Sequence, residues 1–294
     1  MELFDRTVEL LIGISQGNEA LKIKNLCIEF DITKGADTKD NTATAKIKVY
    51  NCNQSTTNLL LTIGRHIVLK AGYKGINSGR DPLVLFNGNI SKAFVEKSKS
   101  DRVINIEAID GVNDLINSSF SYSFIENTDV YTVVKKVTEI MGFTTKGLEN
   151  SPDNAQVYST LKTSFYHQGY AYFGMAKDCL REVLNRVGLT YSIQNEILYI
   201  HFPNTKIQNL GFVIKTSTGL LSVPQQLFEE KDEQVNTDRP RWKFKALLYP
   251  QLIPNSVCKV ESSTLNGEVL IREAHFQGSN MRGEFSVELM VEQL

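Results

Sequence analysis

Alternating apolar and polar positions predict β-structure near the N-terminus. Residues 26–32 carry an apolar side chain at every second position, and residues 43–49 repeat the alternation. Because successive side chains of a strand point to opposite faces, each run predicts a strand with one buried face. We expect the two strands to pair as a long hairpin around the polar sequence KGADTKDN. Glu29 and Asp31 would then lie opposite lysines of the second strand, at about 0.2–1 kcal/mol per pair.

β-prone runs also mark the rest of both ends of the chain. Pro250 and Pro254 separate two of these runs, and because proline cannot donate to a sheet ladder, they delimit a turn. Asn266-Gly267 is a strong signal for a two-residue hairpin. Further strands are expected at residues 6–13, 67–71, 86–96, 102–109, 244–249, 256–260, 267–276 and 283–292, with a short helical connection at 53–61.

The two ends share a pattern, which predicts two copies of one β-module. When they are superposed, Ile67 and Leu69 match Cys258 and Val260 on one strand face, and the first copy carries a longer loop from Gly72 to Pro82. A chance likeness between antiparallel β-domains is the alternative, since all of them obey the same alternation. The superposed segments are Gly64–Leu69 with Asn255–Val260, Asn87-Gly88 with Asn266-Gly267, and Val103–Ala108 with Phe285–Met290.

Helical periodicity replaces this alternation in the middle of the chain. Apolar residues recur at helical spacing over residues 130–141, behind the capping candidates Thr128 and Asp129. A second helix is expected over residues 176–187. Each run is followed by a glycine, which is typical of a helix C-terminus.

Two further segments complete the middle of the chain. The aromatic stretch Phe165–Phe173 is expected to form core and interface, with a platform for a sugar or a base as the alternative. After the second helix, LTYSI and ILYIHF flank Gln194-Asn195-Glu196 and predict a hairpin. Residues 111–205 are therefore expected to form an α+β insert between the two β-modules.

Composition and charge narrow the classes of partner. The 294 residues include 32 Lys and Arg against 33 Asp and Glu, and a net charge of −1 predicts no broad basic face for nucleic acid. No apolar run approaches the roughly 18 residues of a membrane-spanning helix, and the acidic start does not resemble a signal peptide. We therefore expect a globular protein that is made and kept in a cytoplasm.

Residue types that carry chemistry lack the spacing that catalysis or metal binding needs. We assign no catalytic, cofactor-binding or metal-binding residue and expect buried free thiols in place of a zinc site. The acidic pairs Glu229-Glu230 and Asp232-Glu233 could in principle serve a glycosidase, although a solvated loop is the expectation. The dispersed residues are Cys27, Cys52, Cys179, Cys258, His66, His167, His201 and His275.

Several segments resemble a known family. TGLLSVPQ at Thr218–Gln225 and ALLYPQLIPNSVCKVES at Ala246–Ser262 are similar to the C-terminal domain of baseplate hub proteins of contractile-tailed phages and related injection machines. Asn25–Asn51, followed by IGRHIVLKAGY and LFNGNI, resembles the N-terminal domain of these hubs. The resemblance spans nearly the whole chain. Asn255 stands where the family often has glycine, and asparagine tolerates the left-handed conformation that glycine would adopt.

The resemblance implies a fold and a role. The fold would be mainly β, with two similar antiparallel β-barrel modules of the tail-tube type at residues 1–110 and 206–294, flanking a small α+β domain at 111–205. The role would be that of a structural virion protein, the central hub subunit of a tail baseplate, assembled in the host cytoplasm. Its expected partners are two further copies in a homotrimer, the tail tube protein, the central spike protein, other baseplate proteins and the tape measure protein.

The resemblance also implies a symmetry match. A tube is built from hexameric rings, and a spike is a trimer. Three chains with two β-modules each would present six similar units to the tube and three chains to the spike. The lumen would let DNA pass without binding it and would not be strongly basic. Lys34–Asn41 would help subunits join, or would form a solvated loop. A cell-wall hydrolase of the same machine and a carbohydrate-binding protein for host recognition are the alternatives.

Overall fold

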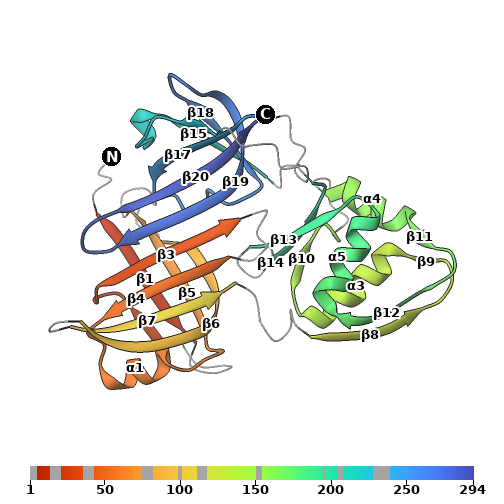
Figure 1. Ribbon diagram of the computed structural model, residues 1–294, viewed down its shortest axis with the longest axis horizontal. Helices are drawn as coiled ribbons and strands as arrows, with labels where there is room; N and C mark the ends of the chain where they lie inside the picture. Colours follow the sequence, from red (N-terminus) through yellow and green to blue (C-terminus); the bar gives the residue numbers. More distant parts are fainter. Residues whose placement is uncertain are drawn as a thin grey trace. The chain divides into compact units, whose positions relative to one another are not determined.

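The chain is mainly β, with helices concentrated in its middle (Figure 1). It divides into two compact units, Met1–Ile109 with Lys206–Leu294, and Asp110–Thr205. The expectation of a mainly β fold with an α-containing insert is therefore confirmed. The computed structural model describes residues 5–13, 21–35, 43–73, 82–98, 101–110, 118–149, 154–194, 197–203, 208–227 and 239–294.

The strands before the insert form what we call the N-module. They are β1 (Arg6–Ile12), β2 (Leu21–Ile23), β3 (Ile28–Gly35), β4 (Thr44–Tyr50), β5 (His66–Tyr73), β6 (Leu83–Ser98) and β7 (Asp101–Ile109), with helix α1 (Gln54–Leu60) between β4 and β5. Their order in the sheet is β2-β1-β5-β6-β7-β4-β3, and every pairing is antiparallel. The predicted hairpin of β3 and β4 is confirmed, with Glu29 opposite Lys48 and Asp31 opposite Lys46.

The strands after the insert form what we call the C-module. They are β15 (Gln208–Ile214), β16 (Gln225–Leu227), β17 (Arg241–Leu247), β18 (Ser256–Glu261), β19 (Asn266–Ser279) and β20 (Phe285–Gln293). β15 pairs with β18 in parallel, which corrects the expectation of a purely antiparallel module. A parallel pair needs a long connection, and the chain between β15 and β18, which includes β16 and β17, provides one.

Both modules belong to one thirteen-stranded sheet. The second half of β19 pairs antiparallel with β3, from Glu273 opposite Gly35 to Ser279 opposite Glu29. The two ends of the chain are thus joined by backbone hydrogen bonds between β3 and β19. One hydrophobic core runs under both and includes Phe30, Ile47 and Phe276.

Corresponding strands have the same order in the two modules. β5-β6-β7-β4 follow one another in the N-module, and β18-β19-β20-β17 do so in the C-module. In each, the long middle strand has a β-bulge against the next strand, at Ser91 in β6 and at Arg272 in β19. When the modules are superposed on these bulges, Lys92 matches Glu273 and Ser98 matches Ser279. This arrangement agrees with the duplication that the sequence predicts.

The expected Asn266-Gly267 turn is wrong. Both residues lie at the start of β19, opposite Glu261 and Val260, and the turn occupies residues 262–265. Ser262 forms this turn because its Oγ accepts a hydrogen bond from the Leu265 amide at 3.0 Å, and its own amide donates to the Leu265 carbonyl at 3.0 Å. A serine side chain that satisfies nearby backbone groups can thus define a turn without an Asn-Gly pair.

The predicted superposition of the modules also needs two shifts of register. Aligned on the bulges, Asn87-Gly88 matches Glu268-Val269, and Val103–Ala108 matches Ser286–Val291. The sequence match paired the two Asn-Gly dipeptides, but Asn87-Gly88 lies inside β6 whereas Asn266-Gly267 begins β19, so the two dipeptides do not occupy equivalent positions.

The second unit packs helices against small sheets. Its elements are β8 (Ser119–Phe124), β9 (Thr128–Asp129), α3 (Val130–Met141), β10 (Thr144–Lys146), α4 (Ala155–Thr163), β11 (Phe165–Tyr166), β12 (Tyr170–Met175), α5 (Ala176–Arg186), β13 (Thr190–Gln194) and β14 (Ile197–His201). Both predicted helices are confirmed as α3 and α5. Asp129 caps α3 by accepting a hydrogen bond from the Thr132 amide at 2.7 Å, and Gly142 ends it with φ of 69°.

In the rest of this unit, helix α4 was not predicted from the sequence, whereas the hairpin after α5 was. Helix α4 was not expected, because it buries only Val157 and Leu161 and therefore shows little apolar periodicity. The predicted hairpin is present as the antiparallel pair β13–β14, although residues 195–196 lie outside the described part. None of the described helices combines the length and the apolarity that crossing a membrane requires.

Candidate functional site

The candidate site is the contact between the two modules, which we call the module junction. There the pairing of β3 with β19 brings residues together that are more than 200 positions apart in the sequence. Asn280 continues the pairing beyond the end of β19. Its side chain donates to the Leu26 carbonyl at 2.7 Å and accepts from the Ile28 amide at 2.9 Å.

Phe285 fills the centre of the junction. Its ring meets Phe30 of β3 edge-on at 5.9 Å and Tyr73 of β5 at 5.2 Å between centroids. The Arg6 guanidinium lies 5.3 Å from the Phe285 ring centroid, within the range of a cation–π contact. Gly278 makes room for this packing, because a Cβ there would lie 2.6 Å from the Phe30 ring and 2.7 Å from the Phe285 ring.

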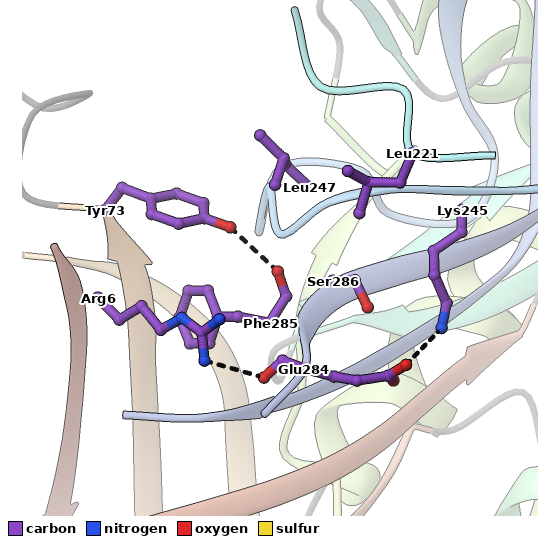
Figure 2. A pocket seen from close by; sticks show the side chains of 8 residues that line it. All are labelled: Arg6, Tyr73, Leu221, Lys245, Leu247, Glu284, Phe285 and Ser286. Atoms are coloured by element: carbon purple, nitrogen blue, oxygen red, sulfur yellow. Dashed lines mark hydrogen bonds and ion pairs between the residues drawn. The ribbon is translucent and has the colours of Figure 1, made fainter. Parts of the chain in front are cut away.

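Polar groups surround this aromatic centre and line a pocket of about 270 Å³ (Figure 2). The Tyr73 hydroxyl donates to the Phe285 carbonyl at 3.0 Å, and Arg6 donates to the Glu284 carbonyl at 3.4 Å. Lys245 of β17 pairs with the Glu284 carboxylate at 2.9 Å. The charged side chains of the pocket thus have partners within the junction, and the arrangement is that of a packed contact between modules.

A buried ion group lies beside the junction, between β17, β19 and β20. Arg272 pairs with Glu292 at 2.8 Å, and the Arg241 Nε lies 3.5 Å from the other carboxylate oxygen of Glu292. The Glu292 side chain is fully buried, and those of Arg272 and Arg241 are 7% and 16% exposed. Arg272 is the bulge residue of β19, so the bulge directs this side chain toward Glu292.

Asp31 links β3 to β19 on the solvent face of the sheet. Its carboxylate accepts from Gln277 at 2.9 Å and lies 2.8 Å from the His275 Nε2. Burial alone would raise the pKa of Asp31, but these two hydrogen bonds and the positive charges of His275 and Lys46 together hold it below its usual 3.8. The ionised form of Asp31 therefore stabilises the junction.

This stabilisation is expected to depend on pH. Because the folded pKa of Asp31 is lowered, its contribution is fully present above the pKa of the unfolded chain and is lost as the pH falls through the folded value. We expect Asp31→Asn to lower the free energy of unfolding by about 0.5–1 kcal/mol at pH 7, since the carboxylate is half exposed. Urea titrations at pH 7 and pH 3 should show a smaller difference at pH 3, which lies below the usual pKa of 3.8. A difference that stays constant would contradict the role of the charge.

The solvent face of the sheet carries both signs of charge. Besides Asp31 and the opposed Lys46, Lys243 pairs with Glu288 at 2.8 Å and Lys92 with Glu107 at 3.7 Å. When the modules are superposed, Lys243 of β17 occupies the position of Lys46 of β4. Both modules therefore carry a lysine at this position of the sheet. Acidic partners therefore accompany these lysines along the sheet.

The dispersed cysteines and histidines do not come together. Cys52, Cys179 and Cys258 are buried, and burial raises their thiol pKa values to about 11, 11 and 12. Thiols in such surroundings are inert. Cys27, which was also expected to be buried, is partly exposed. Among the described residues, no group of three or more His, Cys, Asp and Glu side chains could hold a metal ion.

The aromatic stretch of the second unit divides into core and surface. Tyr166 is buried, and Tyr170 and Tyr172 pack against the core of the unit. The Tyr170 hydroxyl lies 3.1 Å from a Glu182 carboxylate oxygen, to which it donates, and burial together with its contacts to Cys179 and Glu182 raises its pKa above 10. Phe173 is 87% exposed. The contacts of the three tyrosines favour the core interpretation over a sugar platform.

Some sequence predictions fall outside the described residues. Of the loop Lys34–Asn41, only Lys34 and Gly35 are described, and they end β3 opposite Ala274 and Glu273. Lys34 is fully buried, with its ammonium group 6.0 Å from the Phe276 ring centroid. The acidic pairs at 229–230 and 232–233 are not among the described residues, and neither is most of the loop at 72–82.

Comparison with known proteins bears on the fold. No family model matches the chain, and no curated protein matches it by sequence. Solved structures do match. The 43 kDa tail protein of prophage MuSo2 from Shewanella oneidensis is 11% identical with a TM-score of 0.66, and the match covers 98% of this chain and 98% of that one. The tail protein from Neisseria meningitidis is 11% identical with a TM-score of 0.63, covering 99% and 97%.

A further match comes from a secretion system. The Escherichia coli c3393 protein, a component of the type VI secretion system with structural similarity to the T4 bacteriophage tail proteins gp27 and gp5, is 11% identical with a TM-score of 0.58. The match covers 97% of this chain and 76% of that one. Because the sequence identities are only 11%, these matches show that the chain shares the fold of these proteins, and no more.

Proposed function

We propose that this chain is the central hub subunit of a phage-type tail baseplate. Three copies form a ring that joins the tail tube to the central spike, and DNA passes through the ring. The observation that carries the proposal is the repeat within one chain, in which two modules have the same strand order and matching bulges and are joined through one sheet. The fold similarity to tail proteins over almost their full length supports it.

The repeat gives the proposal a physical basis. Two similar modules joined edge to edge within a chain are related by one rotation, and repeating that rotation produces either a closed ring or an open filament. A ring of three chains contains six modules and matches both a sixfold tube and a threefold spike. Closure also removes strand edges that would otherwise promote aggregation.

The paired charges of the sheet agree with passage of DNA. Retention of DNA depends on lysines and arginines that neutralise phosphates. Lys92, Lys243 and Lys245 have acidic partners in this chain, and the net charge is −1. We therefore expect the solvent face of the sheet to bind passing DNA only weakly. Tight binding of double-stranded DNA by the assembled particle at 150 mM salt would contradict a passive channel.

The proposal is tested by the mass of the purified chain in solution. We expect light scattering to give three times the 33.1 kDa of one chain. A mass of one chain at every concentration up to the millimolar range, or a dimer, would contradict the ring. The alternative of a cell-wall hydrolase remains a hypothesis, and release of peptidoglycan fragments by the purified chain would support it.

A further inference from the structure

The module junction indicates how one copy of the chain contacts the next. In the C-module, β19 has β20 along one edge and shares its other edge between two strands. β18 covers the first part, from Asn266 to Leu270, and β3 of the N-module covers the second part, from Glu273 to Ser279. The second part of β19 is therefore where another module attaches.

The corresponding strand of the N-module is covered over its first part only. β7 pairs along one edge of β6, and β5 covers the other edge from Leu83 to Asn89. Arg65 and Gly64 extend the cover to Ile90 through backbone bonds of 3.0 and 2.8 Å. From Lys92 to Ser98, no described residue pairs with this edge of β6. Superposed on the bulges, this stretch matches Glu273–Ser279, the stretch that β3 covers in the C-module.

The strand equivalent to β3 is present in the C-module and has an uncovered edge as well. β4 and β17 match through their pairing with β7 and β20, so Lys46 matches Lys243. In the C-module, Gln225 of β16 lies opposite Lys243. In the N-module, Asp31 of β3 lies opposite the matching Lys46. β16 therefore occupies the place of β3, and on the edge away from β17 it has no partner among the described residues.

Exposed apolar side chains mark both uncovered edges. Phe94 and Val95 on β6 are 44% and 37% exposed, and Val223, two residues before β16, is 59% exposed. Large apolar side chains on an open strand edge are an aggregation hazard in a monomer, because such an edge pairs with other chains. Their presence on both edges is consistent with edges that are covered in the assembled protein.

We infer that β16 of one copy pairs antiparallel with the Lys92–Ser98 edge of β6 in the next copy, as β3 pairs with β19 within the chain. Transferring the register of β3 and β19 places Leu227 opposite Phe94 and Gln226 opposite Val95. Pro224 would lie opposite Lys97 and, lacking an amide hydrogen, limits the ladder at that end. The inference rests on the proposed ring and specifies which strands close it.

Disulfide cross-linking tests this register. In a Cys27→Ser background, which removes the partly exposed thiol, Phe94→Cys is combined with Leu227→Cys. Opposed residues of antiparallel strands have Cβ atoms about 4.5–5.5 Å apart, close enough for a disulfide after small adjustments. The matched control combines Phe94→Cys with Gln226→Cys, because a slip of one residue places the two side chains on opposite faces of the sheet.

Mild oxidation followed by non-reducing gel electrophoresis separates the outcomes. We expect covalent trimers from the Phe94→Cys/Leu227→Cys chain at a yield at least tenfold above that of the control, with unchanged melting temperatures for both. Equal yields from two chains that light scattering shows to be trimeric would overturn the strand pairing and leave the proposed ring intact. Monomeric chains without cross-links would overturn both.

Discussion

Glu292→Ala is expected to lower the free energy of unfolding by about 3–5 kcal/mol, the usual cost of removing one partner from a buried ion pair. Glu292 is fully buried and is the carboxylate that faces both Arg272 and Arg241. Its loss leaves the buried Arg272 guanidinium without this counter-charge. Urea unfolding followed by circular dichroism measures the change. A loss below about 1 kcal/mol would show that solvent reaches the site after the substitution.

A double variant separates the cost of an unpaired charge from the value of the pair. Glu292→Leu with Arg272→Met removes the closer pair of charges and keeps apolar volume, while Arg241, whose side chain is 16% exposed, remains. Such replacements are often neutral or stabilising, so we expect most of the stability lost in Glu292→Ala to return. A double variant as unstable as Glu292→Ala would instead indicate that the ion pair itself stabilises this part of the sheet.

Phe285→Ala is expected to cost about 3–5 kcal/mol, because it opens a cavity where the two modules meet. The ring is 4% exposed and contacts Phe30, Tyr73 and Arg6, all of which belong to the N-module. Thermal and urea unfolding would measure the loss. We also expect faster hydrogen exchange at β3 and β19, since the packing that holds their pairing is removed.

Phe285→Leu serves as the matched control for the aromatic contacts. Leucine keeps most of the apolar volume but loses the edge-on contacts with Phe30 and Tyr73, each worth about 0.5–1.5 kcal/mol beyond burial. We therefore expect the free energy of unfolding of Phe285→Leu to lie between that of the wild type and that of Phe285→Ala. Equal losses in the two variants would contradict cavity formation as the main cause.

Local patterns in the sequence predict the local structure well. The alternation around Phe30 and Ile47 predicts β3, β4 and their register, because buried and exposed faces fix the pairing of a hairpin. The Asp129 cap and Gly142 delimit α3, because both act on neighbouring backbone groups. These features depend on residues that are close together in the chain.

Contacts between distant segments could not be predicted in the same way. No local signal indicates that β3 pairs with β19 or that β15 runs parallel to β18. Glu292 shares a strand face with the partly exposed Glu288, so alternation places it in solvent, whereas the structure buries it against Arg272 and Arg241 of the two neighbouring strands. The module junction was not predicted as a site for this reason, since Arg6, Tyr73 and Phe285 come from three separate parts of the sequence.

The repeat of the β-module is the feature on which the proposed ring depends. Electron microscopy of the purified assembly, with class averages viewed down its axis, counts the modules directly. The account predicts a closed ring of three chains with six similar densities around a central channel. A twofold-symmetric particle, or an open filament, would contradict it.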